Sequence, residues 1–303
     1  MRKMLAGVAV LTFIATACAS STTTSSPAAT GGAAQTAQQC AAGAGFVRDG
    51  TLTVGTDSPA YPPYFQGGTE KGSQWDINDP STGKGFESAV AYEIANRMGF
   101  SADQITWVVV PFAQSYAPGP KEFDFDINQI SYSMRRAQAV DFSDSYYDVN
   151  QAVVVVKGTP IAGATSVADL ARYKLAAPLG TTSADLIESY IGGTAGTYQT
   201  LRDSVAAVNA GQADGVVVDY PTALYMADPY VQQVHNSTVL AQFPNDAVEG
   251  GEHFGTVQAK GSTLTPCIDL ALQEMKSDGT LQSITDEWLS KKTNVGEVPV
   301  WSK

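Results

Sequence analysis

The chain has 303 residues and carries 18 Lys and Arg against 30 Asp and Glu, a formal net charge of −12 at pH 7. Phosphate binding needs a basic face, so this acidic balance argues against nucleic acid as a partner. It is compatible with a cationic small ligand, although a solvated surface is the simpler explanation of the charge.

The N-terminal residues indicate export. Met1-Arg2-Lys3 precedes an apolar run, which is typical of a secretory signal at 1–17 and is too short to span a membrane. Ala15-Thr16-Ala17-Cys18 resembles a bacterial lipobox, which implies a lipid on Cys18 and a location outside the cytoplasm, at the cell membrane. An ordinary cleaved signal with an incidental cysteine is the alternative. Residues 18–44 are rich in Ser, Thr, Ala, Gly and Gln and are expected to form a flexible linker.

The rest of the chain alternates between strand-like and helix-like segments. Roughly 260 residues are many for one core, so two lobes are expected. In 86–98, apolar residues recur at helical spacing. The alternation predicts α/β lobes with mostly parallel sheets. The expected strands are 51–56, 105–110, one within 123–131, 152–156, 174–177 and 215–218, and the expected helices are 86–98, 167–171, 183–191, 201–210, 264–275 and 281–289.

The cysteines favour one disulfide. If Cys18 carries lipid, Cys40 and Cys267 remain, and an even pair in an exported chain favours a bond between them. Two free thiols are the alternative. Neither His235 nor His253 has ligand-like neighbours, so we expect no metal and no cofactor.

The segment 123–143, FDFDINQISYSMRRAQAVDFS, is the most informative part of the sequence. Its Arg136 can present a planar fork of donors to a carboxylate, and nearby serines can add neutral donors. The segment resembles the S-x-T-x-x-R-x-x-x-V-x-F-S block of the family 3 solute-binding proteins, which deliver polar amino acids to ABC importers. The matching residues are Ser131, Ser133, Arg136, Val140, Phe142 and Ser143.

The resemblance implies that Arg136 grips the α-carboxylate of an amino acid. Arg135 is the competitor for this role, and a surface arginine in an ordinary turn is the plain alternative.

The resemblance also implies a fold. It is the two-lobed type II periplasmic-binding-protein-like fold, an α/β architecture with discontinuous lobes. Here lobe 1 would comprise 45–145 and 242–303, and 146–241 would contain the hinge and lobe 2. Two crossing segments, near 146–151 and 238–242, would form the hinge. The ligand would sit between the lobes, and closure around it would be the functional motion.

Two further motifs match the family. In GQADGVVVDYPTA, Asp219 ends a predicted strand and resembles the aspartate that pairs with the ligand ammonium; a helix N-cap before Pro221 is the alternative. Gly180-Thr181-Thr182 resembles a G-T-T motif, in which Thr181 and Thr182 supply a hydroxyl and amides to the carboxylate. By itself that tripeptide is a common cap.

The expected wall around the ligand side chain comes from a third motif. Asp57 and Tyr61 resemble a G-T-D-x-x-Y-x-P-F pattern with one extra residue, and Phe112 stands where many members have Trp. The two aromatic residues could instead belong to a lobe core. Gln129, on the strand expected before Ser131, would offer its backbone carbonyl to the ammonium.

The resemblance predicts a monomeric, lipid-anchored protein that binds a free amino acid and delivers it to an ABC importer permease. Asp57 and Glu87 would suit a basic side chain, whereas Asn128 and Gln129 would suit an amide. The alternatives are a stand-alone amino-acid sensor and a cleft enzyme of the cyclohexadienyl dehydratase type. The enzyme is disfavoured because no extra Glu or His is evident at the matched pocket positions and no hydrolase motif is present.

Overall fold

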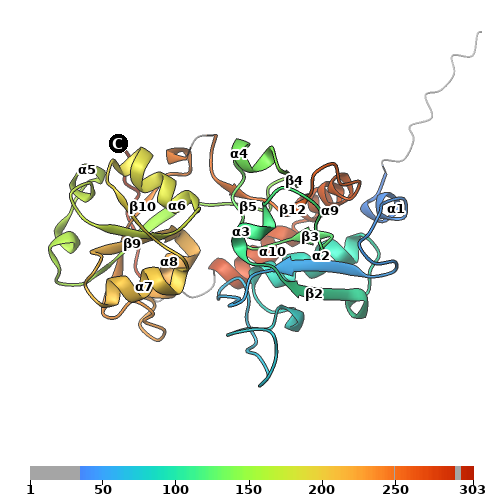
Figure 1. Cartoon of the computed structure of the whole chain (residues 1–303), viewed down its shortest axis with the longest axis horizontal. Helices are drawn as coiled ribbons and strands as arrows, with labels where there is room; N and C mark the ends of the chain where they lie inside the picture. The colour runs from blue at the N-terminus through green and yellow to red at the C-terminus, as the bar shows by residue number, and fades with distance from the viewer. Residues whose placement is uncertain (1–34, 249, 291–294) are drawn as a thin grey trace, which may run out of the picture. The chain divides into compact units, whose positions relative to one another are not determined.

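The computed structural model describes residues 35–248, 250–290 and 295–303. These residues build two five-stranded sheets with helices packed on them, the two-lobed α/β fold expected from the sequence (Figure 1). The predicted signal, Cys18 and most of the predicted linker lie outside the described residues. None of the described helices is long and apolar enough to cross a bilayer.

Lobe 1 is built around a sheet with strand order β2-β1-β3-β12-β4. β1 runs parallel to β2 and β3, whereas β12 is antiparallel to β3 and β4. Helices α2, α9 and α10 contribute Phe86, Ile268 and Leu281 to one buried cluster with Val54 of β1. The bounds are β1 Leu52–Thr56, β2 Ile105–Val109, β3 Phe125–Asp126, β4 Val140–Phe142, β12 Val257–Ala259, α2 Phe86–Arg97, α9 Thr265–Ser277 and α10 Thr280–Thr285.

Lobe 2 has the strand order β10-β6-β9-β7-β8. Its sheet is covered on both faces, because successive side chains of a strand point to opposite sides. In β6, Val154 packs in one buried cluster and Val153 and Val155 pack in the other. The bounds are β6 Gln151–Val156, β7 Leu175–Pro178, β8 Ala195–Tyr198, β9 Gly215–Asp219, β10 Ser237–Phe243, α6 Thr182–Leu186, α7 Leu201–Asn209 and α8 Tyr220–Ala227.

Shorter elements complete the described chain. They are α1 Ala37–Ala41, α3 Phe112–Ser115, α4 Met134–Ala137, α5 Val167–Leu170, β5 Tyr147–Asp148 and β11 His253–Phe254, with 3-10 segments at Pro80–Thr82, Ala102–Gln104, Pro160–Gly163 and Asn245–Ala247 and π-helical turns at Ile187–Ile191 and Asp286–Ser290.

The hinge is formed where β5 pairs antiparallel with β11. Beyond this pair, the Val149 amide donates to the Glu252 carbonyl at 3.1 Å, and the Asn245 side chain donates to the Val149 carbonyl at 3.1 Å. The outgoing and returning segments therefore lie side by side. Glu252 is at the centre of this crossing.

The sheets are mixed, which corrects the expectation of mostly parallel sheets. β6 is antiparallel to both of its neighbours, β9 and β10, and β12 is antiparallel to β3 and β4. These antiparallel strands lie next to the crossings, where the chain enters or leaves a lobe at the hinge. Strands linked by helices within a lobe, such as β7 and β9, stay parallel.

The expected second crossing at 238–242 is wrong. These residues belong to β10, whose side chains alternate between buried and half-buried along STVLAQF as in a strand with one covered face. The C-terminal segment also departs from the expected lobe 1 assignment. Val298 packs in a lobe 2 core, and the Trp301 amide donates to the Gln242 carbonyl at 2.9 Å.

The last part of the expected linker is ordered. Thr36 caps α1 in a reciprocal pair with Gln39, and Ala37 and Ala41 are buried. Cys40 of α1 forms a disulfide with Cys267 of α9, with a Cα–Cα distance of 5.2 Å and a sequence separation of 227. A cap and the disulfide that the cysteine count favoured fix this short helix within a segment whose composition is typical of a linker.

Candidate functional site

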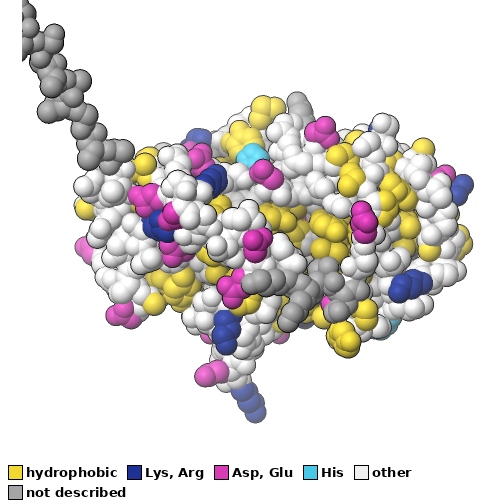
Figure 2. Space-filling view, turned by 180° about the vertical axis from the view of Figure 1, so that it is seen from behind, with side chains coloured by type: hydrophobic (Ala, Val, Ile, Leu, Met, Phe, Trp, Pro, Cys, Tyr) yellow, Lys and Arg dark blue, Asp and Glu magenta, His cyan; other side chains and the backbone are white. Residues whose placement is uncertain are grey.

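A cavity of about 430 Å³ lies between the lobes. This volume is in the range of small-molecule sites. All nine residues that the sequence predicts as ligand-binding line it: Asp57, Tyr61, Phe112, Gln129, Ser131, Arg136, Thr181, Thr182 and Asp219. The surface outside is acidic, and Figure 2 shows Lys and Arg scattered among Asp and Glu rather than gathered in one patch.

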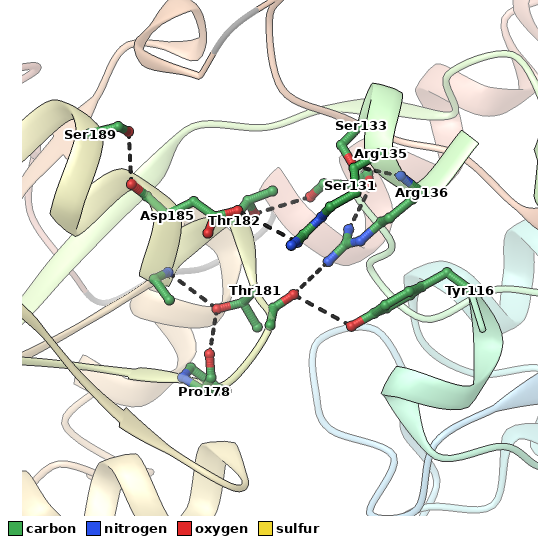
Figure 3. A network of polar contacts seen from close by, with 12 residues as sticks. Tyr116, Ser131, Ser133, Arg135, Arg136, Pro178, Thr181, Thr182, Asp185 and Ser189 are labelled. Atoms are coloured by element: carbon green, nitrogen blue, oxygen red, sulfur yellow. Dashed lines mark hydrogen bonds and ion pairs between the residues drawn. The ribbon is translucent and has the colours of Figure 1, made fainter. Parts of the chain in front are cut away.

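Arg136 is buried at the end of lobe 1 that faces lobe 2. Its Nη1 donates to the Ser131 carbonyl at 2.6 Å, and its Nη2 donates to the Gly180 carbonyl at 2.9 Å (Figure 3). The guanidinium carbon lies 4.4 Å from the centroid of the Tyr116 ring. Burial lowers the pKa of Arg136, and Nε has no hydrogen-bond partner among the described residues. The side chain is therefore fixed in place and retains donor capacity.

Arg135 is the competitor for the carboxylate role, and its surroundings differ. Its side chain is 74% exposed and approaches Asp185 only at 4.0 Å (Figure 3). Ser133 caps α4 by accepting the Arg136 amide at 3.2 Å, which sets the rotation of the helix and turns Arg136 inward. Of the two arginines, Arg136 is the one that lines the cavity.

Asp219 occupies the N-cap position of α8 without making a side-chain capping bond. Its Oδ1 instead accepts a hydrogen bond from the Gln151 amide at 2.6 Å. Burial and the neighbouring carboxyl group of Glu252 raise the pKa of Asp219 well above its usual value. The helix-cap alternative therefore does not describe this side chain, which lines the cavity.

The hydroxyls of the Gly180-Thr181-Thr182 turn are already bonded within the protein. Thr181 donates to the Pro178 carbonyl at 2.8 Å and caps α6 by accepting from the Ala184 amide at 3.3 Å. Thr182 donates to Glu252. The turn thus reaches the cavity with both hydroxyl protons directed to protein acceptors.

The sequence predicted that Gln129 lies on a strand. In the structure it instead follows β3 and has a positive φ of 47°. Its amide donates to Glu87 at 2.6 Å, and its side-chain amide bonds the same carboxyl group. Tyr146 also donates to Glu87. Glu87 is fully buried behind Gln129 and does not line the cavity, so it does not face a basic ligand side chain as the sequence suggested. Burial raises the pKa of Glu87 to about 7.

Asp57, Tyr61 and Phe112 also line the cavity. The Arg136 guanidinium carbon lies 5.5 Å from the centroid of the Phe112 ring. Asp57 accepts from the amides of Ser58 at 2.7 Å and Phe112 at 3.4 Å, and burial raises its pKa. The Phe112 ring is only partly buried, against Tyr116. Nearby, Arg202 of lobe 2 forms an ion pair with Asp76 of lobe 1 at 2.7 Å.

The family assignment follows from the sequence match. Residues 52–291 match the bacterial extracellular solute-binding proteins, family 3. The chain belongs to this family.

Relatives of this solute-binding protein are known. The L-cystine-binding protein TcyJ of Escherichia coli (strain K12) is 26% identical over 244 residues, which are 79% of this chain and 82% of TcyJ. An ancestral arginine-binding protein bound to arginine is 27% identical, with a TM-score of 0.62 over 79% of this chain and 98% of that one. The ancestral amino acid-binding protein AncCDT-1, a precursor of cyclohexadienyl dehydratase, is 26% identical, with a TM-score of 0.62 over 79% and 95%.

Sequence reasoning missed several residues at the site of this solute-binding protein. Tyr116 packs on Arg136, Gln151 joins two carboxyl groups, and Glu252 bonds both lobes. No local motif marks them, because each contact joins residues far apart in sequence. Within the described part of the chain, no three His, Cys, Asp or Glu side chains gather as metal ligands would.

Proposed function

We propose that this solute-binding protein captures a polar α-amino acid, preferentially one with a cationic side chain, in the cavity between its lobes. It delivers the amino acid to the permease of an ABC importer. Lipid on Cys18 keeps the protein at the outer side of the cell membrane during this exchange.

One observation carries the proposal. Arg136 of lobe 1 and Asp219 of lobe 2 bring opposite charges to one cavity. A zwitterionic amino acid bridges such a pair, with its carboxylate at the guanidinium and its ammonium at the aspartate. Because the two residues belong to different lobes, the ligand binds the closed arrangement better than an open one and stabilises closure.

The side-chain preference rests on the remaining charge. After Arg136 and Asp219 are matched to the zwitterion, Asp57 remains as the further charged residue of the lining, beside the aromatic rings of Tyr61 and Phe112. A cationic side chain is complementary to this carboxylate and to aromatic faces. The similarity to an ancestral arginine-binding protein bound to arginine is in line with this preference. An amide ligand, held by Asn128, is the second choice.

Thermal unfolding of purified residues 19–303 tests the proposal. The panel is the twenty amino acids with ornithine and citrulline, followed by calorimetry on every hit. At a ligand concentration 100 times Kd, binding stabilises the folded state by about 2.7 kcal/mol, which is readily seen as a higher Tm. A rise with Arg, Lys or ornithine supports the proposal. A rise with only acidic or apolar amino acids contradicts the side-chain preference, and a flat panel contradicts amino-acid binding.

A further inference from the structure

Glu252 is a buried carboxyl group that contacts both lobes and that the proposed function does not use. It lies in the returning hinge segment and is 1% exposed. Its Oε1 accepts a hydrogen bond from Ser131 Oγ of lobe 1 at 2.7 Å and another from Thr182 Oγ1 of lobe 2. Its Oε2 accepts from the Gln151 amide at 3.0 Å. These three partners all donate to the carboxyl group, which is the environment of an ionised carboxylate.

These bonds decide what the two hydroxyls offer to a ligand. A hydroxyl has one proton and two lone pairs, and a carboxylate only accepts. Both protons are taken by Glu252, so Ser131 and Thr182 have only lone pairs left for the cavity that they line. Their oxygens lie 3.4 Å apart. The pair therefore forms an acceptor site near Asp219 rather than a donor site for a carboxylate.

Gln151 keeps this arrangement in one orientation. Its amide nitrogen donates to both Asp219 and Glu252, which uses both of its hydrogens, and its oxygen accepts from Ser183 Oγ at 2.7 Å. An inverted amide would place an oxygen against two carboxyl groups. Burial raises the pKa of Glu252, whereas the hydrogen bonds from Thr182, Ser131 and Gln151 and the nearby Arg136 lower it. The carboxyl group of Glu252 in turn raises the pKa of Asp219.

We propose that Glu252 sets the hydrogen-bond polarity of Ser131 and Thr182, so that the two hydroxyls accept from the ammonium group of the bound amino acid. Glu252 is thus a positioning residue that acts through the two hydroxyls. This inference rests on the proposed function and specifies it further. An ammonium has three N–H donors. Asp219 and the two hydroxyl oxygens are acceptors for them, beside the Gln129 carbonyl that the family resemblance implies. The ligand carboxylate is left to Arg136.

The test compares two ligands that differ only in the ammonium. L-arginine and 5-guanidinopentanoic acid, which is arginine without its α-amino group, are titrated into the wild type and Glu252→Gln by calorimetry. Glutamine is isosteric but brings an amide donor. With this nitrogen in place of Oε1, the Ser131 and Thr182 hydroxyls accept from it and turn their protons toward the cavity. We expect Glu252→Gln to weaken arginine binding at least about tenfold and to change binding of the des-amino analogue less than about twofold.

Two further variants make the test decisive. Thr182→Val deletes one acceptor, together with its hydrogen bond to Glu252, but keeps the Glu252 carboxyl group. It should show the same selective loss, including if Glu252→Gln fails to fold. Asp124→Asn is the matched control, because Asp124 is also a buried carboxyl group but bonds the amides of Val47 and Thr53 away from the cavity. It should leave the ratio of the two affinities unchanged, whatever it does to stability.

The outcomes separate this inference from the proposed function. Equal losses for both ligands mean that Glu252 acts only through structure or that the hydroxyls serve the carboxylate, which both ligands carry. Either reading overturns the inference and leaves the proposed function standing. A wild type that binds no amino acid of the panel overturns both. If the panel returns glutamine instead of arginine, L-glutamine and glutaramic acid form the same pair.

Discussion

Arg136 of lobe 1 donates its Nη2 to the Gly180 carbonyl of lobe 2 at 2.9 Å. One guanidinium thus holds main chain of the opposite lobe and also lines the cavity. The lobe contact and the proposed ligand contact therefore depend on the same planar group.

Arg136→Lys should therefore weaken amino-acid binding although it keeps the positive charge. A lysine offers a compact ammonium in place of the fork, and a buried ligand carboxylate then lacks a second donor. We expect a loss of roughly 3 kcal/mol, or about 100-fold in Kd measured by calorimetry. Arg135→Lys is the matched control next in sequence, and its exposed side chain predicts less than about a twofold change. Similar losses in the two variants would contradict the assignment of the carboxylate contact to Arg136.

The ion pair between Asp76 and Arg202 should act mainly on ligand release. The pair joins the lobes at 2.7 Å, but both side chains are 60% exposed, so we expect it to contribute at most about 1 kcal/mol. Arg202→Ala should speed dissociation, measured by stopped flow, by up to about fivefold, and high salt should remove the difference. The exchange Asp76→Arg with Arg202→Asp should restore slow release. A release rate that stays unchanged in Arg202→Ala would show that this pair does not hold the lobes together.

Glu87 predicts a loss of stability with rising pH. Because burial raises its pKa from 4.5 to about 7, the folded state binds a proton that the unfolded state has released between these values. The protonated Glu87 therefore contributes its full stabilisation below pH 4.5. As the pH rises to about 7, the free energy of unfolding should fall by roughly 3 kcal/mol. Urea unfolding across this range should therefore show a falling free energy of unfolding. In Glu87→Gln the free energy of unfolding should fall less steeply with pH, because the folded state no longer binds the extra proton of Glu87.

Tyr146→Phe provides the complementary test. The Tyr146 hydroxyl donates to Glu87 and favours its ionised form. Its removal should extend the decline in stability to higher pH. Identical pH profiles for wild type, Glu87→Gln and Tyr146→Phe would mean that Glu87 does not titrate in this range.

The disulfide should stabilise lobe 1 without affecting recognition. Replacing Cys40 and Cys267 with Ala removes a covalent link between residues 227 positions apart in sequence. We expect the free energy of unfolding to fall by roughly 2–5 kcal/mol. Wild type unfolded in reductant should give the same curve as the double variant. Amino-acid affinity should remain unchanged, since neither cysteine lines the cavity. A large loss of affinity in a folded double variant would contradict this separation.

The sequence predicted what depends on local pattern. The strand at Leu52–Thr56 and the helix at Phe86–Arg97 can each be recognised within one segment, and a motif match located Arg136 and Asp219 at the cavity. It did not predict contacts made across the hinge. Glu252 carries no motif, and its partners come from both lobes.

Errors near the crossings have two origins. The family resemblance placed a crossing at 238–242, although the local alternation of these residues belongs to β10. Gln129 has a positive φ, and Glu87 accepts hydrogen bonds from both its backbone amide and its side-chain amide. This contact joins residues 42 positions apart. Such restraints depend on tertiary partners and leave no trace in local composition.

The first and last described segments lie on different lobes. α1 is bonded to α9 in lobe 1, whereas Trp301 packs on lobe 2 and the Lys303 amide donates to the Tyr190 hydroxyl at 3.0 Å. Dyes attached near residues 36 and 303 would therefore report lobe movement by energy transfer, with the cavity left untouched. The two ends of the folded chain thus offer attachment points for an optical sensor of whichever solute the protein closes upon.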